Sequence, residues 1–181
     1  MYFIKYTDEL TVATVRPETK LADTAVAVYP DDKRYAHLIG KEFDVVLAGH
    51  EIHIKVIADK SIDPAFGSGA LGVTPAHSEI DFNMAQKHDL PLIQLIEMDG
   101  RLNEHGGKYA GMAVAQAREA FVADLRKSGQ LVKEEAYVAP IAVCERSGTV
   151  IEPLLSTQWF IRVDELKRKA IRAVKNADTR I

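Results

Sequence analysis

A short alternating stretch that stops at a proline is the strongest constraint on how this chain folds. Residues 10–15 alternate apolar with polar or small side chains, a pattern typical of a half-buried β-strand. Arg16 precedes Pro17 and is therefore biased away from helical backbone, whereas Pro17 suits the first position of a helix. The sequence predicts a strand that ends in a turn suited to binding a polar ligand. The cation, the carboxylate and the two hydroxyls of this turn are Arg16, Glu18, Thr14 and Thr19.

Further short strands follow, without a regular alternation with helices. The stretches 43–47 and 52–57 flank Ala48-Gly49-His50-Glu51, which predicts a hairpin turn. Other strands are predicted at 24–29, 92–97, 131–138 and 141–144, and helices at 79–88, 112–127 and 162–177. A doubly wound sheet would need a more regular alternation of strand and helix. We therefore expect an α/β domain, a mixed-sheet β-barrel-like fold with flanking helices.

The composition fits a single globular domain. A chain of 181 residues can bury a sizeable core, and no apolar run is long enough to span a membrane. The N-terminal residues lack the form of a signal peptide, and the single cysteine, Cys144, indicates a reducing compartment, so we expect a cytoplasmic protein. A net charge of -3 argues against a large nucleic-acid footprint but leaves open a local contact with one end of a nucleic acid.

A second polar cluster lies between residues 72 and 81. Ser78 and Asp81 fit a capping box ahead of the helix predicted at 79–88, which is one interpretation of Asp81. The other interpretation is a carboxylate that faces the ammonium group of a ligand. His77 is a weak candidate metal ligand with Asp81 or Glu79, because the chain has no His-x-x-x-His pair and no second ligand cluster. We therefore predict no metal site.

Several catalytic motifs are missing from the sequence. It contains no Gly-x-Ser-x-Gly elbow, no phosphate-binding loop and no Gly-x-Gly-x-x-Gly fingerprint. Ser147 stands where a Cys-x-x-Cys zinc knuckle would have its second thiol after Cys144. If the domain is catalytic, its chemistry uses a bound water and positioned polar groups. A simple surface ion pair between Arg16 and Glu18, worth about 0–1 kcal/mol, is the alternative interpretation of the first cluster.

The combination of these motifs resembles the editing domain of valyl-tRNA synthetases. The isoleucyl and leucyl families have similar domains but differ at the position of Glu18: the leucyl type usually has Asp there, and the isoleucyl type has Pro-Trp-Thr in place of Pro-Glu-Thr. The motifs that carry the resemblance are Thr14-Val15-Arg16-Pro17-Glu18-Thr19, residues 21–30, Tyr35-Ala36-His37-Leu38-Ile39-Gly40-Lys41, Phe66-Gly67-Ser68-Gly69-Ala70-Leu71, Val73-Thr74-Pro75-Ala76-His77 with Asp81, and Ser156-Thr157-Gln158-Trp159-Phe160.

The resemblance implies a fragment of a class I synthetase. Residues 1–155 would be the editing domain, and residues 156–181, with their basic helix, the segment that returns to the synthetic body. The domain would hydrolyse mischarged threonyl-tRNA(Val) with a bound water, and its partners would be the tRNA(Val) 3′ end and the rest of the synthetase. Editing would need no cofactor, since ATP would be used only by the absent synthetic domain, whose signature motifs this sequence lacks.

The resemblance also implies roles for individual residues. Asp81 would hold the α-amino group of the substrate. The pocket around the terminal adenosine, the ester and the water would contain Arg16, Thr14 and Thr19, with Glu18 organising Arg16. Phe66 would pack against substrate, and Thr74 would contribute a hydroxyl. The implied catalytic residues are Asp81, Thr19 and Arg16, and the implied substrate-binding residues are Thr14, Glu18, Phe66, Gly72, Thr74, His77 and Ser78.

Three positions depart from the family pattern. Many members have Thr where Val15 stands, Lys where Gly72 stands and Asp where Ser78 stands. The pocket therefore loses one cation and one anion, which either compensate each other or alter its specificity. Two other functions stay open: a non-catalytic module that binds the tRNA 3′ end, and an isoleucyl-type editing domain that clears valyl-tRNA.

Overall fold

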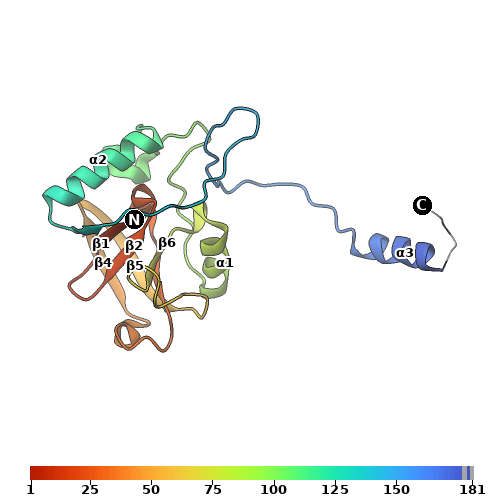
Figure 1. Ribbon diagram of the computed structural model, residues 1–181, viewed down its shortest axis with the longest axis horizontal. Helices are drawn as coiled ribbons and strands as arrows, with labels where there is room; N and C mark the ends of the chain where they lie inside the picture. The colour runs from red at the N-terminus through yellow and green to blue at the C-terminus, as the bar shows by residue number, and fades with distance from the viewer. Residues whose placement is uncertain (177–178, 180–181) are drawn as a thin grey trace.

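Two β-sheets with flanking helices form the body of the molecule in the computed structural model, which describes residues 1–176 and 179 (Figure 1). The three-stranded antiparallel sheet has the order β2-β1-β7, and the four-stranded sheet has the order β4-β5-β3-β6. In the second sheet β3 and β5 pair in parallel, whereas β4–β5 and β3–β6 pair antiparallel. The strands are β1 (Tyr2–Lys5), β2 (Thr11–Thr14), β3 (Ala25–Val28), β4 (Glu42–Leu47), β5 (His50–Ala58), β6 (Ala70–Val73) and β7 (Leu131–Glu134).

Helices α1 and α2 flank the sheets, whereas α3 lies apart from them (Figure 1). The α-helices are α1 (Glu79–His88), α2 (Val114–Lys127) and α3 (Asp164–Lys175), and the 3-10 helices are η1 (Pro17–Ala22), η2 (Ala36–Leu38), η3 (Pro75–His77) and η4 (Glu104–Tyr109). The expected α/β class with a mixed sheet is confirmed. The sheets do not close into a barrel, because within the described residues β2 and β6 contact each other without strand pairing. The barrel-like part of the expectation is corrected accordingly.

Several local predictions are confirmed because short-range chemistry decides them. The β4–β5 hairpin turns at Ala48 and Gly49, whose φ angles of 49° and 86° allow the tight reversal between twisted strands. Helix α1 has the predicted bounds, and α2 begins only two residues late, at Val114. Gly129 follows the end of α2 with φ +72°, the left-handed conformation that glycine adopts without strain.

The strand predicted at 92–97 is wrong. Leu95 and Ile96 are fully buried, as that prediction requires, but they form only an isolated bridge from Ile96 to Leu102. The backbone N–H groups of Leu95 and Ile96 are bound by the side chain of His77 instead of by a neighbouring strand. The strand predicted at 131–138 ends at Glu134, and the one at 141–144 is reduced to a bridge from Val143 to Val150.

The C-terminal segment leaves the body. Figure 1 shows α3 at the end of an extended stretch, well away from the two sheets. No residue of α3 is buried, and Trp159 is fully exposed at 101%. The helix predicted at 162–177 is found as Asp164–Lys175, and residue 177 lies outside the described residues. Across the described part of the chain, no helix combines the length and apolarity needed to cross a bilayer.

Candidate functional site

The first polar cluster is a turn in which two hydroxyls fix one arginine. After β2 the chain passes through Arg16 in a non-helical conformation (φ -125°, ψ 69°) and enters η1 at Pro17. The hydroxyl of Thr14 accepts a hydrogen bond from the Arg16 backbone N–H at 3.0 Å. The hydroxyl of Thr19 donates to the Arg16 carbonyl at 2.9 Å. Both polar groups of one peptide segment are thus satisfied locally, which fixes where the Arg16 side chain starts.

The guanidinium of Arg16 joins three separate segments of the chain. Its Nε lies 3.5 Å from Oε1 of Glu18, and its Nη1 donates to the carbonyl of His77 at 3.2 Å. Its Nη2 pairs with Oε2 of Glu152, which belongs to residues 150–155, the stretch that passes beside the site before the C-terminal segment and is called here the returning chain. The pair with Glu18 is not the surface ion pair that the alternative interpretation assumed, because the Glu18 side chain is 0% exposed. Arg16 therefore ties the end of β2 to η3 and to residues 150–155.

Glu18 has a second and closer partner that the sequence did not reveal. Arg118 of α2 donates to both carboxylate oxygens of Glu18, from Nε at 2.7 Å and from Nη2 at 2.8 Å. This two-point geometry matches a guanidinium to a carboxylate and raises the pKa of Arg118. Arg118 is 100 residues away and reads as an ordinary polar position of an amphipathic helix, so no local signal identifies it.

The second cluster forms where β6 passes through η3 into α1. Ser78 caps α1, since its hydroxyl accepts from the backbone N–H of Asp81 at 3.3 Å. Asp81 does not complete the capping box. Its Oδ2 instead accepts from the backbone N–H of Thr74 at 2.8 Å. Its Oδ1 has no protein partner among residues 1–176 and 179. This oxygen is not enclosed by the protein, so solvent can reach it.

Asp81 is thus oriented by one oxygen and open at the other. A carboxylate oxygen that is held beside an N-capped helix start and reaches solvent can accept a hydrogen bond from a ligand ammonium or hydroxyl. The capping interpretation and the binding interpretation therefore apply to different residues: Ser78 caps the helix, while Asp81 retains an acceptor.

His77 is committed to the fold. Its Nε2 accepts from the backbone N–H groups of Leu95 at 2.8 Å and Ile96 at 3.2 Å, so Nδ1 carries the proton and donates to the Pro153 carbonyl at 3.2 Å. Burial lowers the pKa of the His77 imidazole and favours this neutral form. Both ring nitrogens are occupied, so His77 reaches a ligand only through its neighbours.

A buried ionic network lies behind the second cluster, on the other side of Thr74. The ammonium of Lys20 lies 2.7 Å from Oδ1 of Asp23, and the hydroxyl of Tyr6 donates to Oδ2 of Asp23 at 2.7 Å. The hydroxyl of Thr74 also donates to Asp23. Burial is the main cause that raises the pKa of Asp23, against the lowering effect of Lys20. The sequence did not identify Lys20 or Asp23, because both read as ordinary residues of a turn.

Gly72 lies against this network. A Cβ at this position would come within 2.1 Å of Oδ2 of Asp23 and 3.1 Å of Nζ of Lys20. The absence of a side chain at Gly72 is therefore required by the network. The other two departures lie elsewhere: Val15 is exposed, and Ser78 caps α1.

The aromatic contact of Phe66 is with Tyr137 and not with a residue of either polar cluster. Its ring packs edge-to-face on Tyr137, with 5.8 Å between ring centroids, and half of its surface is exposed. The two rings form an accessible aromatic pair. Tyr137 follows β7 and carries no motif, so sequence reasoning missed it.

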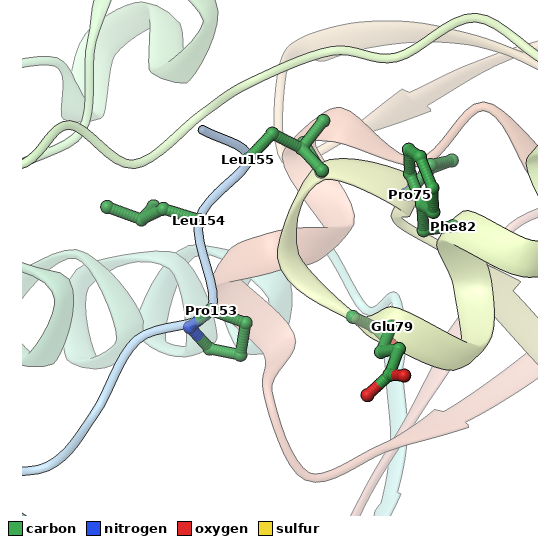
Figure 2. Close-up of a pocket in the computed structure, with 8 residues that line it drawn as sticks. Pro75, Glu79, Phe82, Pro153, Leu154 and Leu155 are labelled. Carbon is green, nitrogen blue, oxygen red and sulfur yellow. The ribbon is translucent and has the colours of Figure 1, made fainter. Parts of the chain in front are cut away.

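A cavity of about 170 Å³ opens beside the start of α1 (Figure 2). Figure 2 shows Pro75 and Phe82 on one side and Leu155 reaching toward them from the returning chain. The returning chain thus forms one wall of the cavity, next to the residue that caps α1. The lining residues are Pro75, Ala76, Ser78, Glu79, Phe82, Pro153, Leu154 and Leu155.

The described residues contain no group of three or more His, Cys, Asp or Glu side chains arranged to hold a metal ion. The polar groups of the site are instead carboxylates, hydroxyls and one guanidinium, each oriented by a neighbour. Such a site can orient a ligand that carries hydrogen-bond donors and can hold a water.

The fold is that of a connective-polypeptide (CP1) editing domain. A solved structure described as "The crystal structure of GlLeuRS-CP1" matches with a TM-score of 0.53 at 15% identity, over 72% of this chain and 84% of that one. The chain is a homologue of one segment of valine–tRNA ligases. The enzyme of Thermotoga maritima is 49% identical over 99% of this chain, and that of Petrotoga mobilis is 48% identical over 97%. The chain spans 21% and 20% of these relatives' length, and no family model matches it.

Proposed function

We propose that this chain is the editing domain of a valine–tRNA ligase and hydrolyses threonyl-tRNA(Val). The observation that carries the proposal is the state of Asp81, whose Oδ2 is held by the Thr74 N–H while its Oδ1 is open. The open oxygen is the acceptor that the α-ammonium of an aminoacyl ester requires. The homology to valine–tRNA ligases supports the class of substrate.

A physical need for such a domain supports the choice of threonine. Threonine and valine are near-isosteres, and a hydrophobic pocket cannot strongly reject an isostere that merely adds a hydroxyl. A polar site can select that hydroxyl, because bound valine would leave the buried polar groups of the site without a hydrogen-bond partner. The acceptors around Thr74 and Asp81 suit a substrate with two donors, an ammonium and a hydroxyl.

In the proposed reaction a water oxygen forms a bond to the ester carbonyl carbon, and the bond from that carbon to the ribose oxygen breaks. One water proton ends on the ribose oxygen, the other is released to solvent, and the amino acid leaves as a carboxylate. The Thr14 hydroxyl uses a lone pair to accept from Arg16, so its proton remains available to a developing negative charge. The mechanism needs no cofactor, and ATP belongs to the synthetic domain.

Exposed groups at the C-terminal end support the proposed partners. Trp159, Phe160 and Ile161 are almost fully exposed, and they precede the basic helix α3. We propose that this segment packs on the rest of the ligase. We further propose that the site receives the tRNA(Val) 3′ end and that the protein acts in the cytoplasm.

The test is a deacylation assay with threonyl-tRNA(Val) and valyl-tRNA(Val). The chain is assayed alone and in place of the homologous segment of the Thermotoga maritima ligase, because the rest of the ligase supplies further tRNA contacts. We expect faster release of threonine than of valine. Asp81→Asn should slow threonine release by about 10- to 100-fold, the range for losing a hydrogen bond to a charged group.

The matched control is Asp89→Asn, which removes the same charge at the other end of α1, where Asn tolerates the left-handed backbone. It should leave the rate unchanged. Unchanged hydrolysis by Asp81→Asn would restrict Asp81 to a structural role. No hydrolysis of either ester in the whole ligase would leave a tRNA-binding module, and a preference for the valyl ester would indicate an isoleucyl-type activity.

A further inference from the structure

Lys20 is a fully satisfied buried lysine whose three acceptors come from two separate segments of the chain. Its Nζ lies 2.7 Å from Oδ1 of Asp23, 2.8 Å from the carbonyl of Gly72 and 2.8 Å from Oγ1 of Thr74. A lysine ammonium has three protons, so every donor of this group has an acceptor. The residue is 3% exposed, and no donor remains for a ligand.

The contacts of Lys20 fall on the end of β6, where the second polar cluster begins. Gly72 and Thr74 flank Val73, so one ammonium holds the strand on both sides of a residue. The N–H of the same Thr74 donates to Asp81. A shift of Thr74 therefore moves the donor that orients the Asp81 carboxylate.

The hydroxyl of Thr74 is also fixed in direction. It donates its proton to Asp23 and accepts from Lys20, which leaves one lone pair. Thr74 thus offers further acceptor capacity but no further donor. The arrangement depends on Lys20 and Asp23 both being charged, since each neutralises the other in a buried place.

The missing side chain at Gly72 completes the observation. A Cβ there would point at Asp23 and Lys20, at 2.1 Å and 3.1 Å. A lysine at position 72 would therefore begin directly beside the ammonium group of Lys20. Many family members carry a lysine at the position of Gly72 in β6. In this chain a lysine ammonium lies in the same place, but it comes from Lys20 of η1.

We propose that Lys20 is a positioning residue of the editing site: from η1 it holds the end of β6, and through Thr74 it sets the orientation of Asp81. The inference rests on the proposed function. Lys20 does not touch the substrate, and its effect on selectivity passes through Thr74 and Asp81.

The first test is Lys20→Met in the ligase that carries this chain, with exposed Lys60→Met as the control. We expect threonine release to slow by about 10- to 100-fold, the scale on which a misplacement of about 1 Å reduces rates. The ratio of threonine to valine release should fall as well. An unchanged ratio with a lower melting temperature would show a merely structural role and overturn the proposal.

The second test transposes the cation. Gly72→Lys alone should be destabilised and slow, because the new Cβ meets the Asp23 carboxylate while Lys20 still holds that carboxylate in place. Lys20→Met releases the carboxylate, which can then turn toward the new ammonium. The double variant Lys20→Met with Gly72→Lys should recover at least about tenfold in rate over the slower single variant, the size of coupling expected for residues in one network. A double variant no faster than the slower single variant would contradict the proposal.

A third measurement does not depend on hydrolysis. Exchange of the Thr74 amide proton, followed by NMR in the 181-residue chain, reports the hydrogen bond to Asp81. It should be faster in Lys20→Met and unchanged in Lys60→Met. Equal exchange in all three proteins would overturn the role of Lys20 even if the esters are hydrolysed. If no ester is hydrolysed, the proposed function fails, and this measurement still decides whether Lys20 positions Asp81.

Discussion

His77 donates from Nδ1 to Pro153 and accepts at Nε2 from two backbone N–H groups, so its neutral form is built into the fold. Protonation of Nε2 would turn this acceptor into a donor that faces the backbone N–H groups of Leu95 and Ile96, so both hydrogen bonds would be lost. Burial accordingly lowers the pKa of His77 below the ordinary value of 6.5. A residue that the sequence motif assigned to substrate therefore joins three segments behind the site.

This histidine predicts a pH dependence of stability. The unfolded chain takes up the proton first as pH falls below about 6.5, so the contribution of His77 is complete above that pH and is lost as pH falls through the lower folded pKa. Urea unfolding between pH 7.5 and 5.0 should show this loss, and His77→Asn should be less stable at pH 7.5 with a flatter dependence.

The exposed His53 is the matched control. Its pKa is raised beside Asp44, so its small contribution has the opposite sign: it is complete below about 6.5 and is lost as pH rises through the folded pKa. His53→Asn should leave the acid loss of stability in place. If it flattened the pH dependence as His77→Asn does, the assignment to His77 would be wrong.

Single residues show where sequence reasoning stops. The cap at Ser78 could be predicted because its partner is three residues away. The partners of Glu18 and Thr74 could not: Arg118 is 100 residues from Glu18, and Lys20 is 54 residues from Thr74. Such pairs depend on how β6, η1 and α2 pack, and no local pattern encodes that packing.

At the scale of elements, a two-point ion pair joins η1 to α2 in addition to their shared apolar core. All six residues of η1 are buried, and Glu18 meets Arg118 of α2 at two points. The pair is asymmetric, because the Glu18 side chain is 0% exposed and that of Arg118 is 37% exposed. Loss of the arginine leaves a buried charge, whereas loss of the carboxylate leaves a cation that water can reach.

The asymmetry predicts unequal costs. Arg118→Met should reduce the free energy of unfolding by about 3 kcal/mol, the low end for breaking a buried pair, since Arg16 still lies near Glu18. Glu18→Gln should cost about 1–2 kcal/mol. Arg126→Met, which breaks an exposed pair with Glu134, should cost less than about 1 kcal/mol. Urea unfolding measures all three, and equal costs for the two partners of the Glu18 pair would contradict the argument.

Elements with strong local signals could be predicted, and those satisfied by distant groups could not. The hairpin around Gly49 and the helix at 79–88 depend on turn and cap chemistry. The stretch 92–97 has the composition of a buried strand, but the imidazole of His77 takes the place of a neighbouring strand.

At the scale of the whole molecule, the body and the C-terminal segment differ in their contacts. Glu152 and Pro153 contact the site, and Leu154 packs against the main core. From Ser156 to Lys175 the side chains are exposed, apart from a half-buried Ala173. The α/β class could be predicted from the mixture of short strands and helices. Whether the sheets close could not, since closure depends on pairing between strands far apart in the sequence. The division at residue 155 remains a prediction.

Truncation tests this division. Chain 1–155 should melt within about 2 °C of the full chain, because the removed residues make few contacts with the body. Chain 1–149 should melt at least about 4 °C lower, since it loses the partners of Arg16 and His77 and the packing of Leu154. Calorimetry of the three proteins decides, and a large loss already in chain 1–155 would move the boundary toward the C-terminus.

The returning chain has a mechanical consequence. Glu152 pairs with the guanidinium of Arg16, and the carbonyl of Pro153 accepts a hydrogen bond from the imidazole of His77. A pull on the chain beyond residue 155 is therefore transmitted to the packed Leu154 and then to these two contacts. Together with the packing of Leu154, these contacts limit how freely the domain can turn relative to whatever the C-terminal segment is attached to.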